Sequence, residues 1–176
     1  MKFIVSFIVF SCFIFLSYGQ EAAQAIDTIK VDSTVVKQDT RNAKQIDEMI
    51  SFAKTFLGTP YRYSGSSPSG FDCSGFIGYV MGGFGFSIPR SSYSIAELGK
   101  TIKLADVQPG DLLFFKGRNI NSTTVGHVAM VVEANETEIK MIHASTTRGV
   151  VIENFKASKY YIPRFIKAKR MENTRP

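Results

Sequence analysis

The sequence predicts an α+β domain in which N-terminal helices pack on an antiparallel sheet of five to six strands. Helical periodicity is confined to the first half of the 176 residues, and short strand-like segments fill the second half. Hydrophobic residues make up 44% of the chain and charged residues 20%, which is typical of a globular protein rather than a disordered one. Helices followed by strands are the element order of an α+β fold.

The N-terminus has the pattern of a secretory signal. A lysine precedes an apolar run from Phe3 to Leu16, and small residues lead to a cleavage point after Gly19. The run is shorter than the ~18–20 apolar residues that cross a bilayer, so we expect no integral membrane span once residues 1–19 are removed. Lipidation of Cys12 is not expected, because four apolar residues follow it. We therefore expect an exported protein, in the periplasm, in the cell envelope or outside the cell.

The charge balance points to a class of partner without naming one. Lys and Arg number 21 and Asp and Glu 15, which gives a net charge of +6 and a pI near 9.3. The basic residues are spread along the chain, so we expect no nucleic-acid partner. A mild positive surplus suits an anionic surface or polymer.

The first helix of the domain is expected after a polar segment. Residues 20–42 are polar and show no sustained period, which predicts a linker or N-terminal arm, and the domain is expected over residues 43–172. Helical spacing then predicts a helix over Ala43–Leu57, ended by Gly58. Its buried face is expected to consist of Ile46, Met49, Ile50, Ala53 and Leu57.

Two further helices follow in the first half of the chain. Asp72 is a competent N-cap for a helix that begins next to it, with an apolar face formed by Phe76, Tyr79 and Val80. A short third helix is expected after Pro89, with Ser91 or Ser92 as its cap and Gly99 as its end.

Five short segments rich in branched and aromatic residues predict the strands. They are Leu112–Phe115, His127–Ala134, Glu138–Ala144, Gly149–Glu153 and Ile162–Arg170. A turn centred on Asn135 is expected to join the second and third of them. The longest connection, residues 116–126, is either a substrate-facing loop or a solvated one.

A single thiol remains once the leader is removed. The chain has two cysteines, and cleavage after Gly19 leaves Cys73 alone in an oxidising compartment. At a helix N-terminus the backbone N–H groups and the helix dipole favour the thiolate, so we expect a pKa below the free value of ~8.5. A buried apolar cysteine is the alternative.

The two histidines of the chain are expected to face each other. A hairpin folded symmetrically about Asn135 places His127 opposite His143, on one face of the sheet, with Cβ atoms ~4.5–5.5 Å apart. One cysteine and two histidines are the parts of a nucleophile, a base and a residue that orients the base. The same three side chains also match a zinc site of a hydrolase, although no His-Glu-x-x-His pattern is present.

Six stretches of the chain, over roughly residues 45–170, resemble those of the NlpC-type family of bacterial cell-wall cysteine peptidases. They are Gly58–Tyr63, Gly70–Phe76, Ile88–Ser92, Gln108–Phe115, Gly126–Val131 and Met141–Ala144. The resemblance implies a papain-like fold that hydrolyses an amide bond in peptidoglycan stem peptides, typically from γ-D-glutamate to a diamino acid such as diaminopimelate. It also implies peptidoglycan or muropeptide fragments as partners, no cofactor and no metal. We expect a monomer.

The resemblance further implies a role for each site residue. Cys73 is the nucleophile that forms an acyl-thioester, His127 the base and His143 the third polar residue. The residues expected to bind the oxyanion or the substrate are Tyr61, Asp72, Ser74 and Arg90. Ile95 stands where the family often has glutamine, which leaves substrate detail open. A non-catalytic wall-binding domain and an acyl-transferring relative are the remaining alternatives.

Overall fold

The computed structural model describes residues 33–172, with side chains from residue 42 onward. The predicted signal at residues 1–19, its Cys12 and the first part of the expected arm lie outside the described residues. The chain divides into two compact units, residues 1–41 and residues 42–176. All side-chain contacts given below belong to the second unit.

Helices come first and most strands afterwards, as the sequence predicts. The helices are α2 (Ser33–Lys54), α3 (Cys73–Gly83) and α4 (Ser92–Ile95), with 3-10 turns η1 (Leu104–Asp106), η2 (Phe155–Ala157) and η3 (Ile162–Arg164). The strands are β1 (Ser66–Ser67), β2 (Gly70–Phe71), β3 (Lys100–Ile102), β4 (Leu112–Lys116), β5 (Val125–Ala134), β6 (Ile139–Ser145), β7 (Gly149–Asn154) and β8 (Phe165–Arg170).

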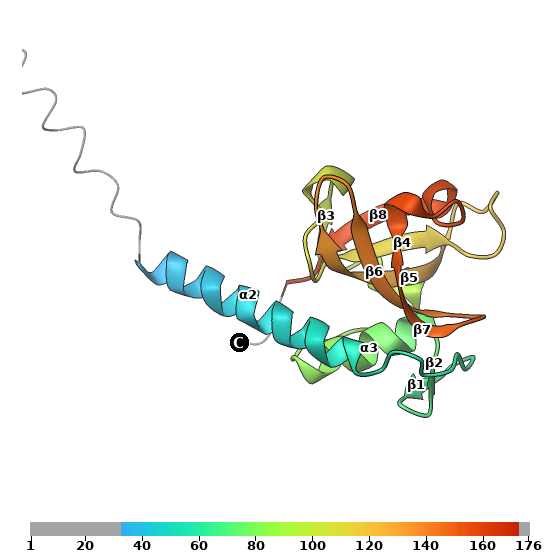
Figure 1. Ribbon diagram of the computed structural model, residues 1–176, viewed down its shortest axis with the longest axis horizontal. Coiled ribbons are helices and arrows are strands. Elements are labelled where there is room, and N and C mark those ends of the chain that lie inside the picture. The colour runs from blue at the N-terminus through green and yellow to red at the C-terminus, as the bar shows by residue number, and fades with distance from the viewer. Residues whose placement is uncertain (1–32, 173–176) are drawn as a thin grey trace, which may run out of the picture. The chain divides into compact units, whose positions relative to one another are not determined.

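The main sheet has six strands in the order β3-β8-β4-β5-β6-β7, and all its neighbours run antiparallel. Strands β1 and β2 form a separate two-stranded ribbon. Helix α3 contacts β1, β5 and β6, and Figure 1 shows it lying along one side of the sheet. The expected α+β architecture with five to six strands is therefore confirmed.

Side chains on both faces of the sheet are buried. The face toward α3 carries one apolar cluster, with Phe76 and Val80 of the helix packed near Phe114 and Met130 of the strands. The opposite face carries a second cluster, which includes Tyr161. Alternate residues of a strand point to opposite faces, so odd-numbered residues of β5 and β6, such as Val131 and Met141, belong to the second cluster.

Helix α2 begins earlier and ends earlier than predicted. It starts at Ser33, so residues 33–42 are helical rather than a linker, because no Gly or Pro interrupts the chain there. It ends at Lys54, and a turn leads to Gly58, whose φ is +83°. Leu57 lies beyond the helix and is 48% exposed, so its placement on the buried face was wrong.

Two strand predictions also need correction. The segment expected to begin a strand at Ile162 forms the 3-10 turn η3 instead, and β8 begins at Phe165. Pro163 occupies this turn and has no N–H to donate to a sheet ladder. Strand β3 was not predicted, because it is only three residues long and has no buried residue to mark a period.

Candidate active site

Cys73 is the first residue of α3, at the point where the sequence places it. The preceding residue, Asp72, is the N-cap, with an extended backbone at φ −90° and ψ 176°. Its Oδ1 accepts a hydrogen bond of 2.7 Å from the Gly75 N–H. The cap therefore holds Cys73 in the first turn of the helix, where the residue is partly exposed.

Arg90 holds the carboxylate of this cap from the other side. Its Nη1 donates to Asp72 Oδ1 at 2.9 Å and its Nη2 to Oδ2 at 2.8 Å. Burial acts to raise the pKa of Asp72, but the Arg90 guanidinium and the Gly75 N–H outweigh it and hold that pKa below its usual range. The carboxylate is thus ionised and occupied by the cap and the guanidinium.

The Cys73 thiol is not acidified in the resting site, contrary to the expectation. Burial raises its pKa above the ordinary value, and the Asp72 charge acts in the same direction. The N–H groups of Val128, Ser74 and Cys73 itself lower it, as a helix N-terminus should, but by less than burial raises it. The Val128 N–H also places the sulfur beside β5, at the residue that follows His127 in the chain.

The two histidines share a face of the sheet, but not by the predicted register. Met130 of β5 pairs with Ile142 of β6, so the continued ladder sets His143 across from residue 129, two positions beyond His127. A bulge lies between Val131 and Glu133. The register at the turn alone would place His127 and His143 on opposite faces of the sheet. The bulge adds one residue to β5, and this brings the two histidines back to the same face.

The imidazoles form a direct hydrogen bond. His127 Nε2 lies 3.0 Å from His143 Nδ1, and the rings are perpendicular. A neutral imidazole has one donor and one acceptor nitrogen. When His127 donates through Nε2, its Nδ1 is the acceptor left to take a proton from a thiol. This pairing is the one that a base and its orienting residue require.

Both rings are neutral at ordinary pH. Burial, together with the charge of a protonated His143, lowers the pKa of His127 to about 3. Burial together with the Arg148 charge lowers the pKa of His143 to about 4. The resting site therefore holds a neutral thiol beside a neutral imidazole pair.

Tyr161 covers both rings and was missed from the sequence. Its ring stacks on His127 with centroids 5.6 Å apart and meets the edge of His143 at 5.2 Å. It is 8% exposed, and burial raises its pKa to about 12, so the phenol stays neutral. No local signal identifies it, because it lies on the segment after η2, far along the chain from both histidines.

Tyr61 lies within electrostatic range of the thiol. Its backbone forms an isolated bridge with Phe71, just before the cap. Burial raises its pKa, and the charges of Cys73 and Asp72 raise it further. The phenol is therefore a neutral O–H donor within electrostatic range of the sulfur.

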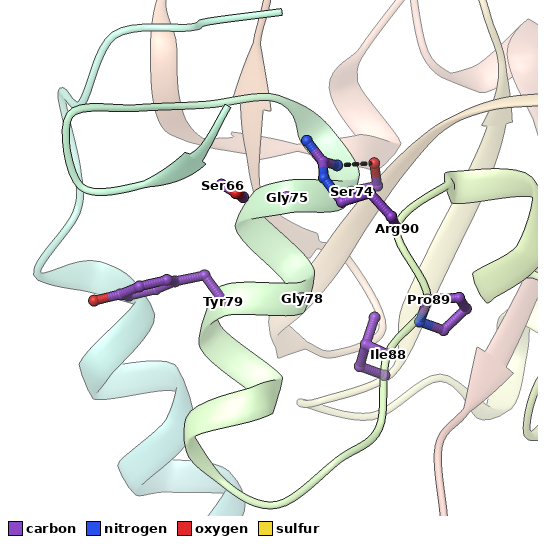
Figure 2. Close-up of a pocket in the computed structure, with 8 residues that line it drawn as sticks. All are labelled: Ser66, Ser74, Gly75, Gly78, Tyr79, Ile88, Pro89 and Arg90. Carbon is purple, nitrogen blue, oxygen red and sulfur yellow. Dashed lines mark hydrogen bonds between the residues drawn. The ribbon is translucent and has the colours of Figure 1, made fainter. Parts of the chain in front are cut away.

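A small pocket of ≈ 260 Å³ lies beside the first turn of α3. Its lining includes Ser66, Ser74, Tyr79, Ile88 and Arg90. Figure 2 shows Arg90 reaching across to Ser74, whose Oγ accepts a 2.9 Å bond from Nη1. The guanidinium is about half exposed, so it presents positive charge to this pocket while it holds Asp72.

A family model described as "NlpC/P60 family" matches residues 58–170. The matched range contains all the residues described above. The chain belongs to the NlpC/P60 family. The resemblance seen in the sequence is thereby confirmed.

Relatives in this NlpC/P60 family carry peptidase names. The chain is 34% identical over 139 residues to the γ-DL-glutamyl hydrolase of Bacillus subtilis, covering 78% of this chain and 33% of that one. It is also 34% identical over 132 residues to the murein DD-endopeptidase MepS/murein LD-carboxypeptidase of Escherichia coli, covering 74% and 65%. The chain thus spans a third of the first relative and just under two thirds of the second.

A solved structure agrees with the fold. The crystal structure of an NlpC/P60 family protein from Bacillus cereus superposes with a TM-score of 0.63 at 35% identity, covering 71% of this chain and 39% of that one. The papain-like α+β fold expected from the resemblance is confirmed.

The arrangement supports nucleophilic chemistry through sulfur. Each histidine uses one ring nitrogen for the hydrogen bond to the other ring. Those two nitrogens are therefore not available to coordinate a metal ion together with Cys73. Over the part of the chain that the structure describes, no three His, Cys, Asp or Glu side chains are grouped to hold a metal ion. Cys73 and Asp72 thus lie at the start of α3 with Tyr61 within electrostatic range, and Ser74 and Arg90 line the adjoining pocket. His127 and His143 form their pair on β5 and β6, and Val128, which follows His127, contacts the sulfur.

Proposed function

We propose that this NlpC/P60 chain is an exported cysteine peptidase that hydrolyses an amide bond in peptidoglycan stem peptides. The bond that we propose joins γ-D-glutamate to a diamino acid such as diaminopimelate. The observation that supports this most is the hydrogen-bonded pair of His127 and His143 on the strand beside the Cys73 thiol. Of the relatives named above, the first is a γ-DL-glutamyl hydrolase, which supports a γ-glutamyl bond, and the second is a murein DD-endopeptidase, which supports peptidoglycan as the substrate.

The proposed reaction begins with proton transfer from Cys73 to His127 Nδ1. The thiolate attacks the scissile carbonyl, and the Cys73 N–H and the Tyr61 hydroxyl donate hydrogen bonds to the oxyanion. The C–N bond breaks as His127 returns the proton to the leaving amine, which leaves an acyl-thioester on Cys73. Water activated by His127 then adds to the thioester and releases the carboxylic acid.

The resting protonation states fit a coupled first step. A raised thiol pKa and a lowered His127 pKa disfavour a standing ion pair, so the proton moves as the thiol attacks. His143 then accepts a hydrogen bond from the new imidazolium through Nδ1. A neutral acceptor stabilises this charge less than a carboxylate would.

Arg90 and Ser74 offer a place for a substrate carboxylate. γ-Linked D-glutamate has a free α-carboxylate close to its scissile amide. The guanidinium is half exposed at the pocket beside Cys73, and the Ser74 hydroxyl adjoins it. We propose that these two groups bind that carboxylate and set the direction of the chain across the thiol.

Export belongs to the same proposal. The substrate lies outside the inner membrane, and residues 1–19 have the pattern of a cleaved signal. Among the described residues, none of the helices combines the length and apolar character needed to cross a bilayer. A periplasmic or cell-envelope location therefore suits both the N-terminal pattern and the proposed substrate.

Mass spectrometry of defined stem peptides tests the function. We expect L-alanyl-γ-D-glutamyl-diaminopimelate to be split after glutamate and the Cys73→Ala variant to leave it intact. Cleavage of the D-alanyl bond in a cross-linked stem peptide, with no γ-glutamyl cleavage, would contradict the proposed bond. Transfer of the acyl group to an added amine, in place of hydrolysis, would instead identify an acyltransferase.

A further inference from the structure

A carboxylate lies behind the histidine pair. Glu153 is on β7, which pairs with β6 so that His143 faces Val151 and Met141 faces Glu153. Glu153 is therefore two positions along from the partner of His143 and on the same face of the sheet. Its Oε1 lies 3.4 Å from His143 Nε2. The imidazole is fully buried, and the carboxylate is 15% exposed.

The protonation of the histidine pair requires a hydrogen-bond acceptor near His143 Nε2. His143 Nδ1 faces His127 Nε2, and only one proton lies between them. When His127 donates that proton, the proton of neutral His143 is on Nε2. Nε2 is buried and forms no hydrogen bond among the described residues. A buried N–H without an acceptor is costly, and the nearest carboxylate oxygen, Glu153 Oε1, lies 3.4 Å from Nε2.

We propose that Glu153 is a positioning residue for the histidine pair. Its carboxylate accepts the Nε2–H of His143, fixes the tautomers of both rings and stabilises the positive charge that His127 takes up. The proton stays on His143 Nε2 throughout, so the carboxylate acts by its charge and position alone. This inference rests on the proposed function and extends it by one residue.

The other charged and titratable groups around His143 are few. His127 faces it from β5, Tyr161 covers it from the segment after η2, and Cys73, at the start of α3, lies against the Val128 N–H of β5. Among the residues that the structure describes, the remaining charge is Arg148, in the turn between β6 and β7, whose Nη2 contacts Glu153 Oε1. Arg148 thus pairs with the carboxylate but repels a protonated His143.

Alkylation of Cys73 by iodoacetamide across pH tests the inference without any peptidoglycan substrate. Only the thiolate reacts, and peptide-resolved mass spectrometry reads Cys73 separately from any other cysteine. In Glu153→Gln we expect the alkylation rate below the thiol pKa, which comes from the minor thiolate–imidazolium form, to shift down about tenfold. Arg148→Gln should shift that rate up, because it removes the opposing positive charge.

Glu133→Gln is the matched control, because it removes the same charge from an exposed position on β5. Its alkylation profile should equal that of the wild type. An unchanged profile in folded Glu153→Gln, or equal shifts in both glutamate variants, would overturn the inference. If the shift is found but no stem peptide is cleaved, the positioning role stands and the proposed function fails.

Nitrogen-15 NMR of the imidazoles gives a readout that needs no variant. Because the chain has two histidines, the long-range ¹H–¹⁵N spectrum contains two ring systems. We expect His143 in the Nε2–H tautomer at neutral pH, and loss of that tautomer in Glu153→Ala, which removes the acceptor that Glu153→Gln keeps. A wild-type His143 protonated on Nδ1 would contradict the proposal.

Discussion

Asp72 links the stability of α3 to the geometry of the thiol. Replacement by alanine removes the acceptor for the Gly75 N–H and both contacts from Arg90. The first turn of the helix then loses its cap, and the guanidinium loses its partner. We expect the protein to be less stable, and Cys73 to be less firmly placed.

The magnitude follows from two contributions. Loss of an N-cap side chain costs about 1 kcal/mol. The Asp72–Arg90 pair adds about 0.5–1 kcal/mol, since the Arg90 side chain is 48% exposed and water screens the charges. Asp72→Ala should therefore lower the free energy of unfolding by about 2 kcal/mol. Asp72→Asn keeps the capping oxygen and should cost about half as much.

Urea denaturation at pH 7 measures the loss in the free energy of unfolding. An unchanged m-value shows that the variant differs from the wild type in stability alone. Asp106→Ala, at an exposed position, is the control and should change stability by less than about 0.5 kcal/mol. The folded pKa of Asp72 is depressed, so its stabilisation exists above the unfolded value of 3.8 and is lost as the pH falls below it. Equal losses in the alanine and asparagine variants, or none, would refute the capping argument.

Three further outcomes follow from the same geometry. Since the pKa values of the two histidines are about 3 and about 4, kcat/KM should stay level down to about pH 5 and decline below it; a midpoint near 6.5 would contradict the burial of the pair. Tyr161→Leu exposes the rings to water, so the acid limb of kcat/KM should move to higher pH by about one unit, and an unmoved limb would exclude the covering role. Gly149→Ala forces a side chain into φ +70° and against the Thr59 carbonyl, and thermal or urea unfolding should show a loss of about 2–4 kcal/mol. The control Gly82→Ala, in α3 with open space around it, should be neutral or stabilising.

Features set by neighbouring residues were predictable from the sequence. A cap depends on a side chain and an N–H three residues later, and Asp72 caps α3 as expected. In the same way Ser91 caps α4 through the Ser94 N–H. Local patterns also predicted that Cys73 lies at the start of a helix. They predicted as well that His127 and His143 share one face of the sheet.

The register of the histidine hairpin was wrong for a physical reason. Asn135 begins the turn rather than standing at its centre, because its Oδ1 accepts hydrogen bonds from the N–H groups of Thr137 and Glu138. Such Asx turns are a known use of asparagine, so the residue type contained the signal. The bulge after Val131 left no comparable mark in the sequence.

Contacts between distant segments could not be predicted. Tyr161 reaches the histidines only because the chain returns over the sheet after η2, and Glu153 approaches His143 only in the observed β6–β7 register. The pKa of Cys73 is a third case. The helix N-terminus favours the thiolate as expected, but burial against β5 depends on tertiary packing and outweighs it.

Covalent trapping tests the central claim most directly. The protein is mixed with a γ-D-glutamyl-diaminopimelate peptide, quenched with acid during turnover and mapped by tandem mass spectrometry. We predict an acyl-thioester on Cys73 in the wild type and none in Cys73→Ala, which should also release no diamino acid. Turnover by Cys73→Ala at the wild-type rate, or an acyl group found only on another residue, would contradict the account.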